Sequence, residues 1–202
     1  MTYLDSVKYN TSEGEKMKNF ILVTGGARSG KSTFAESKAK EIGKSIVYIA
    51  TSIPFDEGTK DRIKKHRQSR PNDWDTIEKY KEFKEIDKHE SFIDSDLILL
   101  DCMTLMVSNL MFENNIDYDN CDYNEIDKIE KSIFSEVEEL ISTMERHKKK
   151  LIIVTNEVGM GIVPSYKLGS IFRDIAGRIN QYLASIASEV YLTVSGIPMK
   201  IK

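Results

Sequence analysis

The residues best suited to chemistry lie in a glycine-rich run that ends in a lysine and a serine. Residues 25–32 read GGARSGKS, which matches the phosphate-binding pattern G-x-x-x-x-G-K-[ST]. The glycines let successive N–H groups turn toward an anion, Lys31 can reach the β- and γ-phosphates, and the Ser32 hydroxyl can ligate Mg²⁺. A chance match is the alternative, but the apolar run before it and the helix-compatible segment after it favour a nucleoside triphosphate site. The predicted nucleotide contacts here are Gly25, Gly26, Ala27, Arg28, Ser29, Gly30, Lys31 and Ser32.

A carboxylate follows a second apolar run. Residues 97–100 read LILL and lead directly to Asp101, and in phosphate-loop proteins an acidic residue at the end of such a strand can hold Mg²⁺ or its water ligands. Many buried strands end in Asp without any such role, which is the alternative. Together with the phosphate loop, the pattern predicts Ser32 and Asp101 as metal ligands.

A basic segment surrounds one histidine. Residues 60–70 carry six cations and one acid around His66, and Arg62 lies one helical turn before it. Neighbouring cations disfavour the imidazolium, so a neutral His66 could attack a phosphorus atom and form a covalent nucleotidyl intermediate. The alternative is a solvated basic face with a structural histidine.

The composition is that of an ordinary globular protein. The 202 residues include 29 Lys+Arg and 32 Asp+Glu, a net charge of −3, which argues against nucleic acid as the main partner. Cys102 and Cys121 form no CxxC pair, so we expect a reducing compartment, no disulfide and no zinc site. No stretch resembles a membrane span or a signal peptide, and we expect a cytoplasmic protein. We interpret the acidic stretch 113–139 as a solvated face.

Short apolar runs alternate with segments of helical period, which predicts a layered α/β domain with a mainly parallel sheet. The expected strands are residues 20–24, 45–50, 96–101, 151–155 and 189–194, and the expected helices are 33–42, 123–147 and 168–188. We expect residues 1–16 to be a disordered extension and residues 17–202 to form a single domain. Because Ala50, Thr51 and Ser52 lie at the end of the second expected strand, they should lie at the ligand-binding edge of the sheet. Asn156 and Glu157 should lie there too.

These motifs together resemble one family, the bifunctional adenosylcobinamide kinase/adenosylcobinamide-phosphate guanylyltransferases of cobalamin biosynthesis. The resemblance extends from Met17 onward. It rests on residues 22–32 (LVTGGARSGKS), 48–52 (YIATS), 62–71 (RIKKHRQSRP), 155–164 (TNEVGMGIVP), 172–181 (FRDIAGRINQ) and 194–202 (VSGIPMKIK).

The resemblance implies two reactions. The first phosphorylates adenosylcobinamide with ATP or GTP, and the second transfers GMP from GTP to adenosylcobinamide phosphate through a guanylylated His66, giving adenosylcobinamide-GDP. It also implies a P-loop NTPase fold, a RecA-like three-layer sandwich with one antiparallel strand, and a homotrimer. The further nucleotide contacts that it implies are Ala50, Thr51, Ser52, Arg67, Gln68, Ser69, Arg70, Glu78 and Asp101.

Two other functions stay open at this point. A monofunctional P-loop kinase of another small molecule would leave His66 structural, and a nucleotide-dependent binding module would turn over no metabolite. Arg173, Asp174 and Arg178 could contact substrate, or Asp174 and Arg178 could form a structural ion pair one helical turn apart.

Overall fold

A seven-stranded sheet forms the centre of the computed structural model, which describes residues 17–52, 71, 73–113 and 116–202. The strand order is β3-β2-β4-β5-β1-β6-β7, and every neighbouring pair is parallel except β6 and β7. The strands are β1 (Phe20–Gly25), β2 (Ile46–Ala50), β3 (Asp75–Glu78), β4 (Leu97–Asp101), β5 (Lys150–Val154), β6 (Glu189–Val194) and β7 (Ile197–Lys200).

The central strands are buried on both faces of the sheet. Along β1, Phe20 and Leu22 pack into one core while Ile21 and Val23 pack into the other, and none is more than 6% exposed. A parallel strand covered on both faces needs apolar side chains at every position. This is why β1, β2, β4 and β5 consist largely of uninterrupted Ile, Leu and Val.

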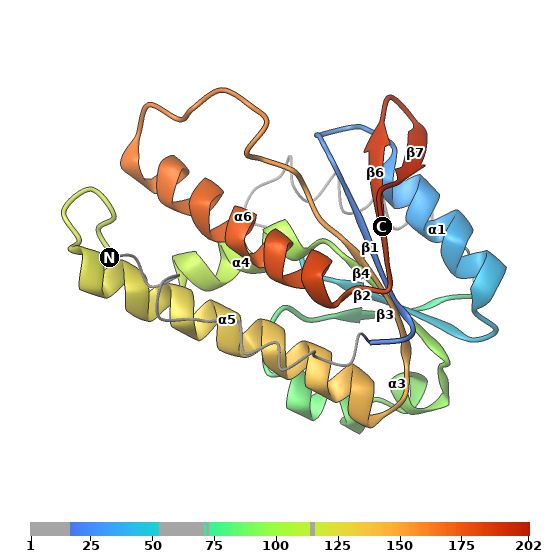
Figure 1. The fold of residues 1–202 in the computed structure, drawn as a ribbon. Helices are drawn as coiled ribbons and strands as arrows, with labels where there is room; N and C mark the ends of the chain where they lie inside the picture. The colour runs from blue at the N-terminus through green and yellow to red at the C-terminus, as the bar shows by residue number, and fades with distance from the viewer. Residues whose placement is uncertain (1–16, 53–70, 72, 114–115) are drawn as a thin grey trace.

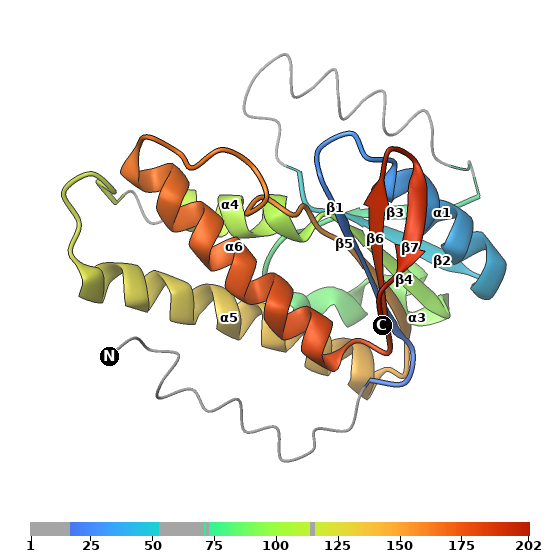
Figure 2. The ribbon, with the colours of Figure 1, turned by 45° about the horizontal axis from the view of Figure 1, so that its top comes forward.

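Helices cover both faces of this sheet (Figures 1 and 2). On one face, α1 (Lys31–Ile42) packs through Ala35 and Ala39. The opposite face carries η2 (Phe83–Lys88), α3 (Glu90–Asp94), α4 (Met103–Phe112), α5 (Tyr123–Arg146) and α6 (Lys167–Ile186). The described residues therefore form a three-layer α/β sandwich with a mainly parallel sheet, which confirms the predicted fold class.

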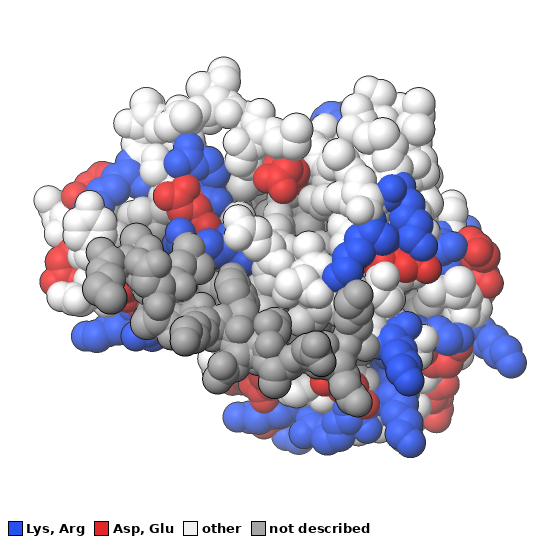
Figure 3. Space-filling model, viewed as in Figure 1, with Lys and Arg blue, Asp and Glu red and all other residues white. Residues whose placement is uncertain are grey.

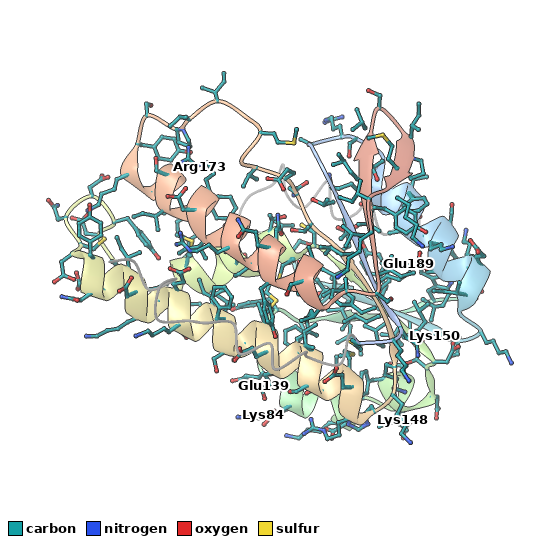
Figure 4. The ribbon with its side chains drawn as sticks, viewed as in Figure 1. Lys84, Glu139, Lys148, Lys150, Arg173 and Glu189 are labelled. Carbon is teal, nitrogen blue, oxygen red and sulfur yellow. The ribbon has the colours of Figure 1, made fainter. Side chains whose placement is uncertain are left out.

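The acidic stretch that includes α5 is only partly a solvated face. The carboxylates of Glu136 and Glu139 accept hydrogen bonds from the backbone N–H groups of Glu82 and Lys84, at 2.9 and 3.2 Å. Figure 4 shows Lys84 beneath Glu139. The exposed N–H groups at the start of η2 are therefore satisfied by α5, and two of the acidic residues fix one element onto another.

The five strands expected from the sequence agree with β1, β2, β4, β5 and β6 to within one residue at each end. The three expected helices agree with α1, α5 and α6 to within two residues. The expectations missed β3, β7, η2, α3 and α4. The predicted extension, residues 1–16, lies outside the described residues. None of the described helices is long and apolar enough to cross a membrane.

Candidate active site

The glycine-rich run forms a tight loop between β1 and α1. Gly25 has φ 152° and Gly30 has φ 91°, and Gly30 directly precedes the first residue of α1. A Cβ on Gly25 would lie 2.4 Å from the carbonyl oxygen of Thr193, so only glycine fits between the loop and β6. The Gly196 N–H donates to the Ser29 carbonyl at 2.8 Å, which ties the loop to the β6–β7 turn.

Lys31 lies inside this loop. Its side chain is buried, and Nζ donates to the carbonyl oxygen of Gly26 at 2.6 Å. Burial lowers the pKa of Lys31 below its ordinary value, although the negative charge of the Asp101 carboxylate acts to raise it. The ammonium is therefore held at the phosphate loop, with Asp101 close enough to influence its titration.

Asp101 ends β4 directly beside Ala50 on β2. Its Oδ2 accepts a hydrogen bond from the hydroxyl of Tyr48 at 3.0 Å, which fixes the direction of the carboxylate. Among the described residues there is no cluster of three His, Cys, Asp or Glu side chains able to hold a metal by themselves. The oxygen donors of Ser32 and Asp101 fit Mg²⁺, which takes one or two protein ligands and completes its shell with phosphates and water.

Buried hydrogen bonds hold the ends of β2 and β4 together. The Thr51 hydroxyl donates to the Cys102 carbonyl at 2.8 Å and accepts from the Cys102 N–H at 2.9 Å. Nδ2 of Asn109, on α4, donates to the Thr51 carbonyl at 2.6 Å. Thr51 is therefore held between the ends of β2 and β4, and its hydroxyl is already occupied by the backbone of Cys102.

Cys102 is not a nucleophile in this setting. Burial raises the pKa of its thiol to about 11, and the charge of Asp101 acts in the same direction. The thiol therefore stays protonated, which suits a structural role.

The remaining sequence-predicted residues divide into two groups. Glu78 ends β3 beside Ala50, so it lies on the same edge of the sheet as Asp101. The residues of the basic segment lie outside the described part of the chain. They are His66, Arg67, Gln68, Ser69 and Arg70.

Of the two alternatives for these residues, the structural Asp174–Arg178 ion pair is wrong. The Arg178 guanidinium instead contacts Glu130 of α5 through both carboxylate oxygens, with Nη2–Oε2 at 2.9 Å. Asp174 pairs with the adjacent Arg173, labelled in Figure 4, at 2.9 Å. The short helical spacing suggested a local pair, whereas α6 packs closely enough on α5 for a contact between residues 48 positions apart.

Sequence reasoning missed the groups that hold the site in shape. These are Tyr48, Thr104 and Asn109, and Asn156 contributes by donating to the Thr104 hydroxyl at 2.7 Å. One sequence signal could have indicated Tyr48. It lies two residues before the end of its strand, so its side chain is on the same face of the sheet as the acidic residue that ends the neighbouring strand.

In the described part of the chain, a pocket and a larger groove lie near the loop. A pocket of about 300 Å³ opens between residues 26–29, Glu157, Met160 and the β6–β7 hairpin. A larger groove of about 650 Å³ runs between α6 and the β1–β6 part of the sheet, and Glu157 also lines it. The Glu157 N–H donates to the Gly25 carbonyl at 2.9 Å, which places Glu157 directly beside the phosphate loop.

The phosphate loop follows β1, and an acidic residue ends β4. Strand β5 lies between β1 and β4 in the sheet. Together these features define a P-loop nucleotide-binding protein of the RecA-like type. Within that class, the chain belongs to the CobU family, described as cobinamide kinase / cobinamide phosphate guanyltransferase, which it matches over residues 21–201.

Three bacterial relatives are similar to the chain over most of their length. The bifunctional adenosylcobalamin biosynthesis proteins CobU of Escherichia coli and of Salmonella typhimurium are each 46% identical to the chain, covering 90% of it and 99% of each relative. The corresponding protein CobP of Pseudomonas aeruginosa is 35% identical, covering 90% of this chain and 96% of its own.

Proposed function

We propose that this enzyme phosphorylates the aminopropanol hydroxyl of adenosylcobinamide with ATP or GTP, and then transfers GMP from GTP to adenosylcobinamide phosphate. The family match over residues 21–201 supports both activities. The observation that carries the kinase step is the phosphate loop itself, with Lys31 buried inside it and Asp101 beside it.

In the kinase step the chain positions the triphosphate and offsets its charge. The N–H groups of residues 26–32 and the N-terminus of α1 would bind the phosphates, and Lys31 would exchange the Gly26 carbonyl for a phosphate oxygen. Ser32 and Asp101 would hold Mg²⁺, which when bound neutralises charge that develops on the β- and γ-phosphate oxygens. Tyr48 keeps the Asp101 carboxylate in position.

The second step is proposed to pass through His66. The neutral imidazole nitrogen would attack the α-phosphorus of GTP, forming a P–N bond while the bond to the bridging oxygen breaks and pyrophosphate leaves. A phosphate oxygen of adenosylcobinamide phosphate would then attack the same phosphorus and release His66. Arg67, Gln68, Ser69, Arg70 and Glu78 are proposed nucleotide contacts, as the family resemblance implies.

The family resemblance also supports a homotrimer. We further propose that the protein acts in the cytoplasm and has no nucleic-acid partner. The assembly would be tested by light scattering of the purified chain, and a monomer would contradict it. A monofunctional kinase and a nucleotide-dependent binding module are the competing functions, and the two-activity family description disfavours both.

Product analysis separates these functions. The purified chain is incubated with adenosylcobinamide, Mg²⁺ and either ATP alone or ATP with GTP, and the corrinoids are resolved by chromatography. We expect adenosylcobinamide phosphate with ATP alone and adenosylcobinamide-GDP when GTP is added. Phosphorylation without the second product would indicate a monofunctional kinase, and nucleotide binding without either product would indicate a binding module.

A further inference from the structure

The groove along α6 and the pocket beside the phosphate loop meet at one carboxylate. Glu157 lines both, and the next residues along the chain divide between them, with Gly159 in the groove and Met160 in the pocket. A molecule lying in the groove could therefore extend one end past Glu157 to the phosphate loop.

Gly177 opens α6 onto this groove. Glycine is less favourable than alanine in the interior of a helix, so such a residue usually has a packing reason. Gly169 has one, because a Cβ there would lie 2.7 Å from the Tyr166 ring. A Cβ on Gly177 would meet nothing within 4 Å, although Gly177 lines the groove. The space beside Gly177 is thus free for a ligand that approaches the helix closely.

The lining suits a ligand with an apolar body and neutral polar edges. Apolar side chains from β1, α6, β6 and the C-terminal residues form the floor, namely Leu22, Ala184, Val190 and Ile201. The rim holds Gln181 and two arginines that are already paired with carboxylates, Arg173 with Asp174 and Arg178 with Glu130. Cations neutralised in this way favour amide groups over a second triphosphate. Figure 3 shows mostly uncharged surface over the neighbouring hairpin and the loop before α6.

Glu157 is the carboxylate best placed to accept a proton at this junction. Its Oε1 accepts a hydrogen bond from the Gly159 N–H at 3.2 Å, and within the described part of the chain it forms no ion pair. The other carboxylate in the groove, Asp174, is held by Arg173. Of the carboxylates that line the groove, Glu157 is therefore the one left to accept a proton from a bound hydroxyl.

We infer that the groove between α6 and β6 binds the corrinoid acceptor, and that Glu157 is the general base of the kinase step. This inference rests on the proposed function. The amide-bearing ring lies over the apolar floor beside Gly177, and the aminopropanol arm reaches the phosphate loop. The arm's hydroxyl oxygen attacks the γ-phosphorus, its proton passes to the Glu157 carboxylate, and the bond from the γ-phosphorus to the bridging oxygen breaks as the nucleoside diphosphate leaves.

The two reactions of the enzyme provide an internal control for Glu157. Only the kinase step removes a proton from a hydroxyl, because adenosylcobinamide phosphate reacts through an already ionised oxygen. In Glu157→Gln we expect kcat for phosphorylation to fall by about 100-fold or more. When adenosylcobinamide phosphate is supplied, the rate of guanylyl transfer should stay within about threefold of the wild-type rate. Glu138→Gln, the same change at an exposed site on α5, should alter neither rate.

Three outcomes would overturn part of this scheme. An unchanged phosphorylation rate in Glu157→Gln would remove Glu157 as the base, and equal losses in both reactions would assign it a structural role. A wild-type enzyme unable to phosphorylate adenosylcobinamide would overturn the proposed function and this inference with it.

The groove is tested separately through Gly177. Gly177→Ala and Gly177→Leu place side chains into the open space of the groove. We therefore expect KM for adenosylcobinamide to rise from the Ala to the Leu variant, by about tenfold for Leu. KM for ATP should not rise, and Tm should not fall. Ser185→Leu, at an exposed site on the same helix outside the groove, should leave both KM values unchanged. An unaltered KM for adenosylcobinamide in Gly177→Leu would place the acceptor elsewhere.

Discussion

The Tyr48 hydroxyl donates a hydrogen bond to Oδ2 of Asp101 at 3.0 Å, joining two neighbouring strands, β2 and β4, at the edge that carries the phosphate loop. The two residues lie on the same face of the sheet as α1, where Tyr48 is buried and Asp101 half-buried. A tyrosine in the core thus sets the direction of the carboxylate that is proposed to hold Mg²⁺.

Tyr48→Phe should weaken Mg²⁺ use while leaving the fold intact. Loss of a hydrogen bond to a charged group costs about 1–3 kcal/mol, and about 1.4 kcal/mol corresponds to tenfold in rate. We expect kcat/KM for phosphorylation to fall by about tenfold and the Mg²⁺ concentration for half-maximal rate to rise. Mg²⁺ titration of the steady-state rate checks this, and a Mg²⁺ dependence equal to that of wild type would show that the hydrogen bond does not position a ligand.

Lys31→Met should remove kinase activity and change how stability depends on pH. Loss of the ammonium at the phosphates should reduce kcat by about 100-fold or more. Burial lowers the pKa of Lys31 below 10.5 in the folded state, so the unfolded chain binds more protons between the two pKa values. The wild type should therefore gain stability as the pH rises through this window.

Denaturant unfolding of the nucleotide-free protein between pH 7 and pH 10.5 tests whether the free energy of unfolding rises with pH as predicted. The stability of Lys31→Met relative to wild type should decrease as the pH rises, and the opposite trend would contradict the direction of the pKa shift. Lys38→Met serves as the control for activity, because Lys38 lies on the same helix and pairs with Glu41 at 3.0 Å at the surface.

Two adjacent glycines of the loop should respond differently to the same substitution. A Cβ on Gly25 would lie 2.4 Å from the Thr193 carbonyl, whereas one on Gly26 would meet nothing within 4 Å. Gly25→Ala should therefore lower Tm by several degrees or prevent folding, and Gly26→Ala should melt close to wild type. Thermal melts of both variants check this, and equal Tm values would mean that the loop is not packed against β6 as described.

Arg178 should matter more for stability than Arg173, although both lie on α6. The Glu130 side chain is 6% exposed, so Arg178→Ala would leave a buried charge without its partner, at a cost of about 3–5 kcal/mol. Arg173 pairs with Asp174 at the surface, and Arg173→Ala should cost about 0–1 kcal/mol. Equal denaturant midpoints for the two variants would contradict the inter-helix pairing.

The parts that the sequence predicted are those with a strong local pattern. The buried strands have continuous apolar runs, and α5 has a stripe that includes Ile129, Ile133 and Val137, all buried in the structure. By contrast, α4 reads MTLMVSNLMF and is apolar nearly all round, so it has no helical period to detect. The edge strands β3 and β7 are short, and β7 contains Pro198.

The same distinction applies to the site. The spacing of the phosphate loop is local, and the loop lies where the sequence places it, between β1 and α1. The contacts that shape the site join residues about 50 positions apart, as in the Thr51–Cys102 and Tyr48–Asp101 pairs. Such contacts depend on strand order, which no local pattern specifies. The alternative of an Asp174–Arg178 ion pair failed for the same reason, since helical spacing carries no information about α5.

The most direct test of the bifunctional assignment is a single-turnover chase of a guanylylated enzyme. The chain is incubated with GTP labelled at the α-phosphate and with Mg²⁺, freed of nucleotide, and mixed with adenosylcobinamide phosphate. We predict acid-labile, base-stable label on the wild type and on His89→Ala, complete transfer of that label to adenosylcobinamide-GDP, and no label on His66→Ala. Full labelling of His66→Ala would exclude His66 as the nucleophile, and a wild-type enzyme that never becomes labelled would contradict the guanylyl-enzyme mechanism.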